Sequence, residues 1–153
     1  MESESDFREE LSTTAFAFRG YNVTNLGKTP ELLEHAVAGP IVERHLVEAS
    51  ELGTRLLGRE VDLVTRVQQR EETTLESYSE AVCQICAVEL AQIEILETHF
   101  DTKLADANCA TGYSLGEVGA LIATGVYELE ALLTPILSFS DDCVELAQSI
   151  RMG

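Results

Sequence analysis

The chain has 153 residues, which suits one domain, and 45% of them are hydrophobic, enough to form a core. Its formal net charge is −17, from 10 Lys and Arg against 27 Asp and Glu, which argues against nucleic acids and anionic membrane surfaces as partners. No apolar run approaches the length of a membrane-spanning helix. The acidic start MESESDFREEL does not resemble a signal peptide, so we expect a cytoplasmic protein with a well-solvated surface.

Turn formers and apolar spacing divide the first half of the chain into an acidic lead, a strand and three helices. Residues 13–19, TTAFAFR, predict the strand because β-branched and aromatic residues run up to Gly20. Thr29 and Pro30 suit the cap and the first position of a short helix, which Gly39-Pro40 then ends. Apolar residues at three- and four-residue steps predict the next two helices. The lead is expected over 1–12, and these two helices over 41–57 and 62–69.

The second half predicts one long helix, a second strand and three shorter helices. The long helix, 79–100, has a broad apolar face that contains Glu89, and we expect this carboxylate at the edge of the face. Small residues then predict a buried strand over 107–112. The segment 115–124 is apolar nearly all round, which predicts a buried helix that Gly125 ends. The last two helices are expected over 129–137 and 140–151, the latter capped by Ser140.

The order of strand, helices, strand and buried helix favours an α/β fold with a parallel sheet. Because only two strands are visible, the expected protein is mostly helical and its sheet is short. A sheet of two strands is a poor core, which is a first indication that the chain is part of a larger domain.

Cys83 and Cys86 form a C-x-x-C pair, a spacing that also occurs in zinc and redox sites. Both fall on one face of the long predicted helix, among apolar residues. Structural zinc usually takes a second close pair, and Cys109 and Cys143 do not form one. We therefore predict buried thiols and no metal site.

The segment ATGYSLGEVGALIATG, 110–125, places the pattern G-x-S-x-G between a predicted strand and a predicted helix. This context is typical of a nucleophile elbow, in which a serine turns sharply from strand to helix in a strained conformation. Gly112 and Gly116 leave room for the neighbouring backbones to pack closely. Ser114 then stands at a helix N-terminus as a predicted nucleophile, and the backbone N–H of Leu115 supplies half of an oxyanion hole.

The segment 112–132, GYSLGEVGALIATGVYELEAL, closely resembles the GHSLGE-type serine motif of malonyl-CoA:acyl-carrier-protein transacylases and of the acyltransferase domains of fatty-acid and polyketide synthases. A looser match places FAFRGYN, 16–22, where that family has its FPGQGSQ loop. The resemblance implies the N-terminal part of an acyltransferase (α/β-hydrolase-like) core, with 13–153 as a partial domain. The residues shared in the serine motif are Gly112, Ser114, Leu115, Gly116, Glu117, Ala120, Leu121, Gly125 and Val126.

In such enzymes the serine takes an acyl group from coenzyme A, and the phosphopantetheine thiol of an acyl carrier protein then collects it. The resemblance thus implies acyl-CoA and an acyl carrier protein as partners, with no cofactor bound to the enzyme itself. Arg19 stands where the family has the first glutamine of its loop, and its backbone N–H is expected to complete the oxyanion hole. Tyr113, Glu117 and Phe139 are expected near the acyl pocket, although a carboxylate at Glu117 equally suits the helix dipole.

The chain differs from this family at the catalytic base. In the family the base is a histidine that follows the serine, whereas His35, His45 and His99 all precede Ser114. His35 and His45 are expected on exposed helix faces, and we predict none of the three as the base. We therefore expect a fragment of a longer acyltransferase, with doubtful activity by itself.

The residues that would select the acyl group also differ from those of malonyl-type members. Malonyl-type members carry an arginine after the serine that pairs with the acyl carboxylate, and at the corresponding spacing this chain has Phe139. Tyr113 replaces the histidine that commonly precedes the serine. Loss of the cationic clamp favours an acetyl or longer uncharged acyl group.

Two other functions stay open. A serine esterase of the α/β-hydrolase type has the same elbow but needs the same missing histidine. A degenerate acyltransferase-like domain would bind acyl-CoA or act as a structural subunit without turnover. The missing histidine, the missing arginine and the charge of −17 favour this second function over a free-standing catalyst. The short sheet would also expose an edge, which predicts self-association.

Overall fold

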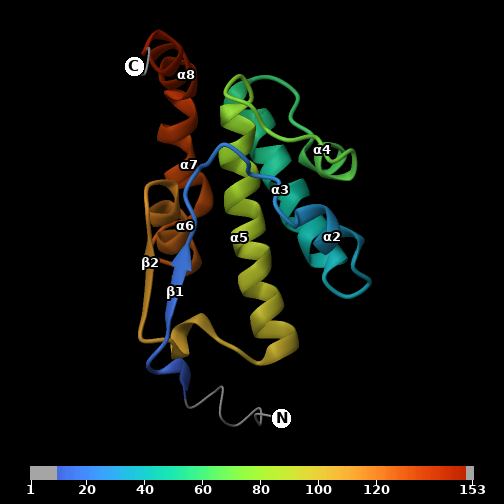
Figure 1. Ribbon diagram of the computed structural model, residues 1–153, viewed down its shortest axis with the longest axis vertical. Coiled ribbons are helices and arrows are strands. Elements are labelled where there is room, and N and C mark those ends of the chain that lie inside the picture. The colour runs from blue at the N-terminus through green and yellow to red at the C-terminus, as the bar shows by residue number, and fades with distance from the viewer. Residues whose placement is uncertain (1–9, 151–153) are drawn as a thin grey trace.

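The computed structural model describes residues 10–150 as a mostly helical protein with a small parallel sheet at one side (Figure 1). Strands β1 (Ala15–Phe18) and β2 (Cys109–Gly112) form the sheet, with Ala15 opposite Cys109 and Phe18 opposite Gly112. This arrangement is compatible with the predicted α/β class. The helices are α2 (Thr29–Glu34), α3 (Gly39–Leu57), α4 (Leu63–Gln68), α5 (Tyr78–Phe100), the 3-10 turn η1 (Leu104–Asp106), α6 (Leu115–Ala123), α7 (Leu129–Ser138) and α8 (Ser140–Ser149).

Helix α5 runs through the middle of the molecule, between the sheet side and α3 (Figure 1). Residues 81–87 are buried all round the helix, because α3 covers one side and α6 lies on the other. On α3 the buried side chains Val42, Leu46 and Ala49 recur at steps of four and three, as an amphipathic helix requires. The main hydrophobic core therefore lies between α3 and α5.

The sheet depends on the helices beside it, because two strands alone are marginally stable. Phe18 at the end of β1 packs with Leu104 of η1 and Ala120 of α6 in a small second hydrophobic cluster. Helix α6 starts just beyond β2 and contacts both strands. The carboxyl ends of both strands thus meet the first turn of α6.

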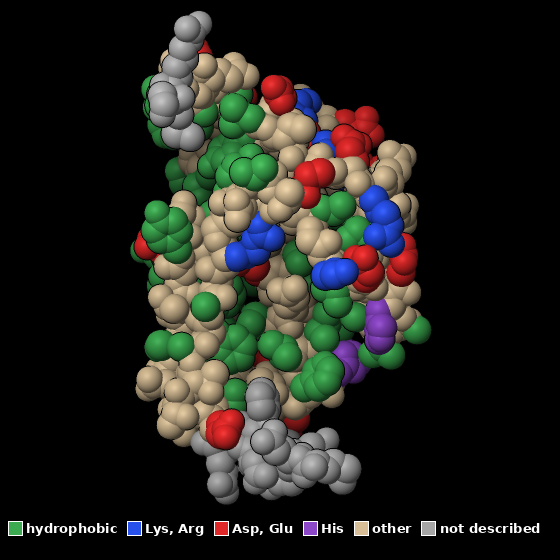
Figure 2. Space-filling model, in the orientation of Figure 1, with side chains coloured by type: hydrophobic (Ala, Val, Ile, Leu, Met, Phe, Trp, Pro, Cys, Tyr) green, Lys and Arg blue, Asp and Glu red, His purple; other side chains and the backbone are tan. Residues whose placement is uncertain are grey.

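Charged side chains gather over α2, α3 and α4 on the face shown in Figure 2, and few lie over the two strands. Glu80 on α5 accepts hydrogen bonds from Arg59 and from Arg66 of α4, each at 2.5 Å, which ties α4 to α5. Within residues 10–150, no helix combines the length and the apolar character needed to cross a membrane.

Three predicted helix ends are wrong. Lys28 holds the cap position of α2, and Thr29 is the first residue of the helix instead of its cap. Gly39-Pro40 begins α3 instead of ending α2, which already stops at Glu34. A proline suits this place because the first turn of a helix needs no N–H donor there. Ser140 lies inside α8, its hydroxyl donates to the carbonyl oxygen of Leu137 at 2.8 Å, and Phe139 holds the cap position.

The buried environments predicted for the strand 107–112 and for the helix 115–124 are also wrong. No residue of β2 is buried. Helix α6 buries one side only, and Leu121 is 37% exposed, because few elements cover its outer side. Leu11 belongs to the expected acidic lead, yet its side chain is buried. Residues 1–9 of that lead and residue 151 of the last predicted helix lie outside the described residues.

Candidate active site

Ser114 forms the turn between β2 and α6 in a conformation that is rare for a residue with a side chain. Its backbone angles are φ 57° and ψ −120°. Such angles cost a non-glycine residue roughly 1–3 kcal/mol, and they persist only where the surroundings enforce them. The side chain is exposed and its hydroxyl does not cap α6. The sharp, strained turn predicted from G-x-S-x-G is therefore present.

Two glycines enforce this turn. A Cβ atom at Gly112 would lie 2.0 Å from the carbonyl carbon of Gly116. A Cβ atom at Gly116 would in turn lie 2.2 Å from the carbonyl oxygen of Phe18. The ends of both strands and the first turn of α6 thus pack backbone against backbone, as predicted for these glycines.

The loop after β1 forms one wall of the site. A Cβ atom at Gly20 would lie 2.7 Å from the carbonyl oxygen of Tyr113 and 3.5 Å from Cβ of Ser114. The Arg19 side chain follows the loop, where Nη2 donates to the carbonyl oxygen of Thr24 and to Oδ1 of Asn25, both at 3.0 Å. The loop that contains Arg19 and Gly20 therefore lies beside the serine turn.

The two backbone donors expected for an oxyanion hole differ in their availability. The N–H of Leu115 is the first in α6 and has no acceptor within its own helix. The N–H of Arg19 instead donates to Oε1 of Glu89 at 2.8 Å. The expectation for Arg19 is corrected on this point, since a carboxylate of α5 already occupies its N–H.

The three side chains expected at an acyl pocket stand on the surface. Tyr113 is 82% exposed and Phe139 is 61% exposed. Glu117 is exposed in the first turn of α6, a position that suits a carboxylate electrostatically. Their side chains therefore do not enclose Ser114.

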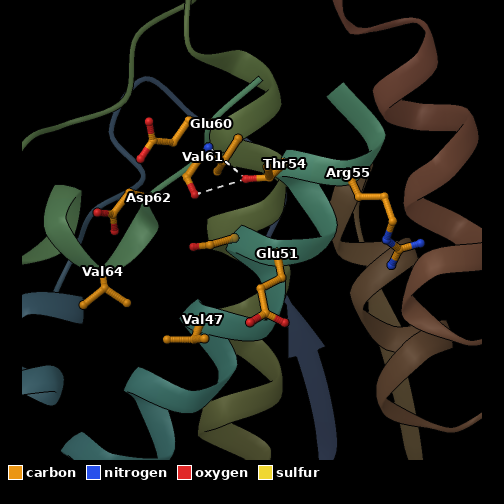
Figure 3. A pocket seen from close by; sticks show the side chains of 9 residues that line it. Val47, Glu51, Thr54, Arg55, Glu60, Val61, Asp62 and Val64 are labelled. Carbon is orange, nitrogen blue, oxygen red and sulfur yellow. Dashed lines mark hydrogen bonds between the residues drawn. The ribbon is translucent and has the colours of Figure 1, made fainter. Parts of the chain in front are cut away.

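A surface pocket lies away from the serine turn, between α3 and the segment that leads into α4 (Figure 3). Val47, Glu51 and Thr54 of α3 line it, and the Thr54 hydroxyl accepts the N–H of Val61 at 3.0 Å. None of the residues of the serine turn lines this pocket. We assign it no part in serine chemistry.

All three histidines are described, and their surroundings differ. His35 is exposed at the end of α2, and its Nδ1 accepts the N–H of Ala38 at 3.2 Å. His45 was predicted on an exposed helix face, and this is wrong. Its ring pairs with Glu94 of α5 at 2.8 Å, and its side chain is 14% exposed. His99 lies near the end of α5 that leads to the start of β2, whereas Ser114 follows the end of β2 (Figure 1).

The chain matches no protein-family model, no curated protein and no solved structure. The acyltransferase resemblance of the serine motif therefore stays a prediction.

Glu89 also belongs to this site, a place that was not predicted from the sequence. Its side chain is not at the edge of a helix face, since the residue is 6% exposed. Oε2 is buried with no hydrogen-bond partner among the described residues, and it would lie 2.1 Å from a Cβ atom at Gly119. Burial raises the pKa of this carboxyl from its ordinary value of 4.5 to about 7, although the Arg19 N–H opposes the shift. The signal in the sequence was a glutamate inside an apolar stripe.

Cys83 and Cys86 are buried thiols, as predicted, while Cys109 and Cys143 are exposed. Burial raises the pKa of Cys83 to about 12 and raises that of Cys86 as well. In the described part of the chain, no group of three His, Cys, Asp or Glu side chains is placed to hold a metal ion.

We expect the four thiols to divide into two classes in the native protein. A disulfide reagent such as dithionitrobenzoate at pH 8 should react with Cys109 and Cys143, because their thiolates are accessible. Cys83 and Cys86 should react only after unfolding in urea. Spectrophotometric titration with mapping of the labelled peptides checks this, and fast native reaction at Cys83 or Cys86 would contradict it.

Proposed function

We propose that Ser114 is a nucleophile that accepts an acyl group from a coenzyme A thioester and passes it to the phosphopantetheine thiol of an acyl carrier protein. The observation that supports this best is the strained turn of Ser114 at a strand–helix junction, closed by Gly112 and Gly116. The likeness of GYSLGEVGAL to acyltransferase serine motifs supplies the substrate class. The proposal includes the fold that this family has: an α/β-hydrolase-like core, of which this chain would be the N-terminal part.

In the proposed reaction the Ser114 oxygen forms a bond to the thioester carbonyl carbon, and the carbon–sulfur bond then breaks. The hydroxyl proton passes to a base and from there to the departing coenzyme A thiolate. The N–H of Leu115 stabilises the intermediate oxyanion at the positive end of α6. The three histidines lie in other surroundings, so we assign none of them as this base.

The test is the intact mass of the protein after incubation with acetyl-, malonyl- and longer acyl-CoA. Exposed Cys109 and Cys143 can take acyl groups from thioesters without catalysis, so each sample is treated with neutral hydroxylamine, which cleaves thioesters much faster than serine esters. A hydroxylamine-resistant mass gain should appear in the wild type and in Ser138→Ala, and should be absent in Ser114→Ala. A gain that persists in Ser114→Ala would refute the proposal.

A second candidate is an acyltransferase-like domain that binds acyl-CoA without turnover. The engaged N–H of Arg19 and the separate settings of the histidines favour it. Calorimetric binding of acyl-CoA with no resistant mass gain would support this candidate. Hydrolysis of p-nitrophenyl esters that depends on Ser114, without transfer to a carrier protein, would support an esterase instead.

A further inference from the structure

Glu89 joins three elements that meet behind the serine turn. It belongs to α5, its Oε1 accepts the N–H of Arg19 just after β1, and its Oε2 faces the backbone of α6 at Gly119. The carboxyl group is buried, and one of its oxygens has no hydrogen-bond partner among the described residues. Burying such a group costs free energy that an apolar side chain would not cost, so packing alone does not explain a glutamate here.

A short series of contacts connects this carboxyl group to Ser114. Arg19, whose amide Glu89 holds, is followed directly by Gly20. Gly20 lies so close to the serine turn that its Cβ would be 2.7 Å from the carbonyl oxygen of Tyr113. A shift of Arg19 away from α5 would therefore move Gly20 relative to Ser114.

We propose that Glu89 is a positioning residue, which holds the amide of Arg19 and thereby fixes the loop after β1 as the wall of the Ser114 site. Its effect on acyl transfer rests on the function proposed above for Ser114. The positioning of the loop is independent of that function, because it depends on the hydrogen bond from the Arg19 N–H to Oε1 of Glu89.

The neighbours of Glu89 make the contact specific. Arg19 and the Cys86 thiol interact electrostatically with Glu89, and the guanidinium of Arg19 donates to Thr24 and Asn25 instead of to this carboxylate. The amide of Arg19 is thus its hydrogen-bond donor among the described residues. Glutamine at position 89 has a side chain of the same length and keeps an oxygen acceptor at its end, whereas alanine has none.

The test measures hydrogen exchange of the Arg19 amide by NMR and labelling of Ser114 by a fluorophosphonate probe. It uses the full chain and the variants Glu89→Gln and Glu89→Ala, with Glu94→Ala as a control on another side of the same helix, where Glu94 pairs with Arg44 and His45 of α3. Glu89→Ala should speed exchange at Arg19 about 100-fold relative to the wild type. It should also slow labelling about tenfold, since reacting groups that lose their alignment react more slowly. Glu89→Gln should restore both, and thermal unfolding verifies that each variant is folded.

The outcomes separate the two proposals. Equal exchange at Arg19 in the wild type and Glu89→Ala would overturn the positioning role, whatever the labelling shows. Faster exchange with unchanged or faster labelling would overturn it too, because the loop would then not assist Ser114. Faster exchange in Glu89→Ala, together with no labelling of the wild type, would leave the hold on the loop in place and refute the function proposed for Ser114.

Discussion

Replacement of Gly116 by alanine is expected to destabilise the protein by about 3 kcal/mol and to abolish labelling of Ser114. A Cβ atom there would lie 2.2 Å from the carbonyl oxygen of Phe18 and 2.9 Å from the carbonyl carbon of Arg19. Both are backbone atoms of β1 and its following loop, so no side-chain rotation relieves the overlap. The first turn of α6 would have to move away from the sheet, and the strained conformation of Ser114 would lose its support.

Urea unfolding followed by circular dichroism measures the change in the free energy of unfolding. Gly58→Ala is the matched control, because a Cβ atom at Gly58 meets nothing within 4 Å. Its left-handed backbone, φ 65°, should limit its cost to about 1 kcal/mol. If Gly116→Ala cost no more than this control, the close packing of the turn would not be required for stability.

Replacement of Glu89 by glutamine is expected to remove a pH dependence from the stability of the protein. The folded pKa of Glu89 is about 7 and its ordinary value is 4.5, so between these values the native state binds more protons than the unfolded state. The free energy of unfolding of the wild type should therefore fall as the pH rises from 4.5 to 7. The expected contribution over this interval is about 3 kcal/mol, and it should be absent in Glu89→Gln.

Urea unfolding at several pH values from 4 to 8 measures this difference. Glu117→Gln is the matched control, because it removes an equal formal charge from an exposed position on α6. The advantage of Glu89→Gln over the wild type should grow up to about pH 7 and then level off. Parallel curves for the two proteins across this range would contradict the burial of a titrating carboxyl group at position 89.

The local features of this protein followed from the sequence alone. The strands at Ala15–Phe18 and Cys109–Gly112, and helices α3 and α5, lie close to where residue type and apolar spacing predicted them. The turn at Ser114 was also predictable, because the lack of a side chain at Gly112 and Gly116 is a property of those residues themselves. The positions of these features along the chain follow from residue types within each segment, whereas the backbone contact of Gly116 with Phe18 joins distant segments.

The environment of each functional group was decided by the tertiary structure. Glu89 is buried, and the N–H of Arg19 is occupied, because α5 packs behind a loop that lies 70 residues earlier in the sequence. His45 is enclosed by its pairing with Glu94, and α6 is left half exposed on its outer side. Apolar spacing predicts which face of a helix is buried, but it does not specify which element covers that face. Burial, pKa and hydrogen-bond partners follow from that covering element, so only the assembled fold determines them.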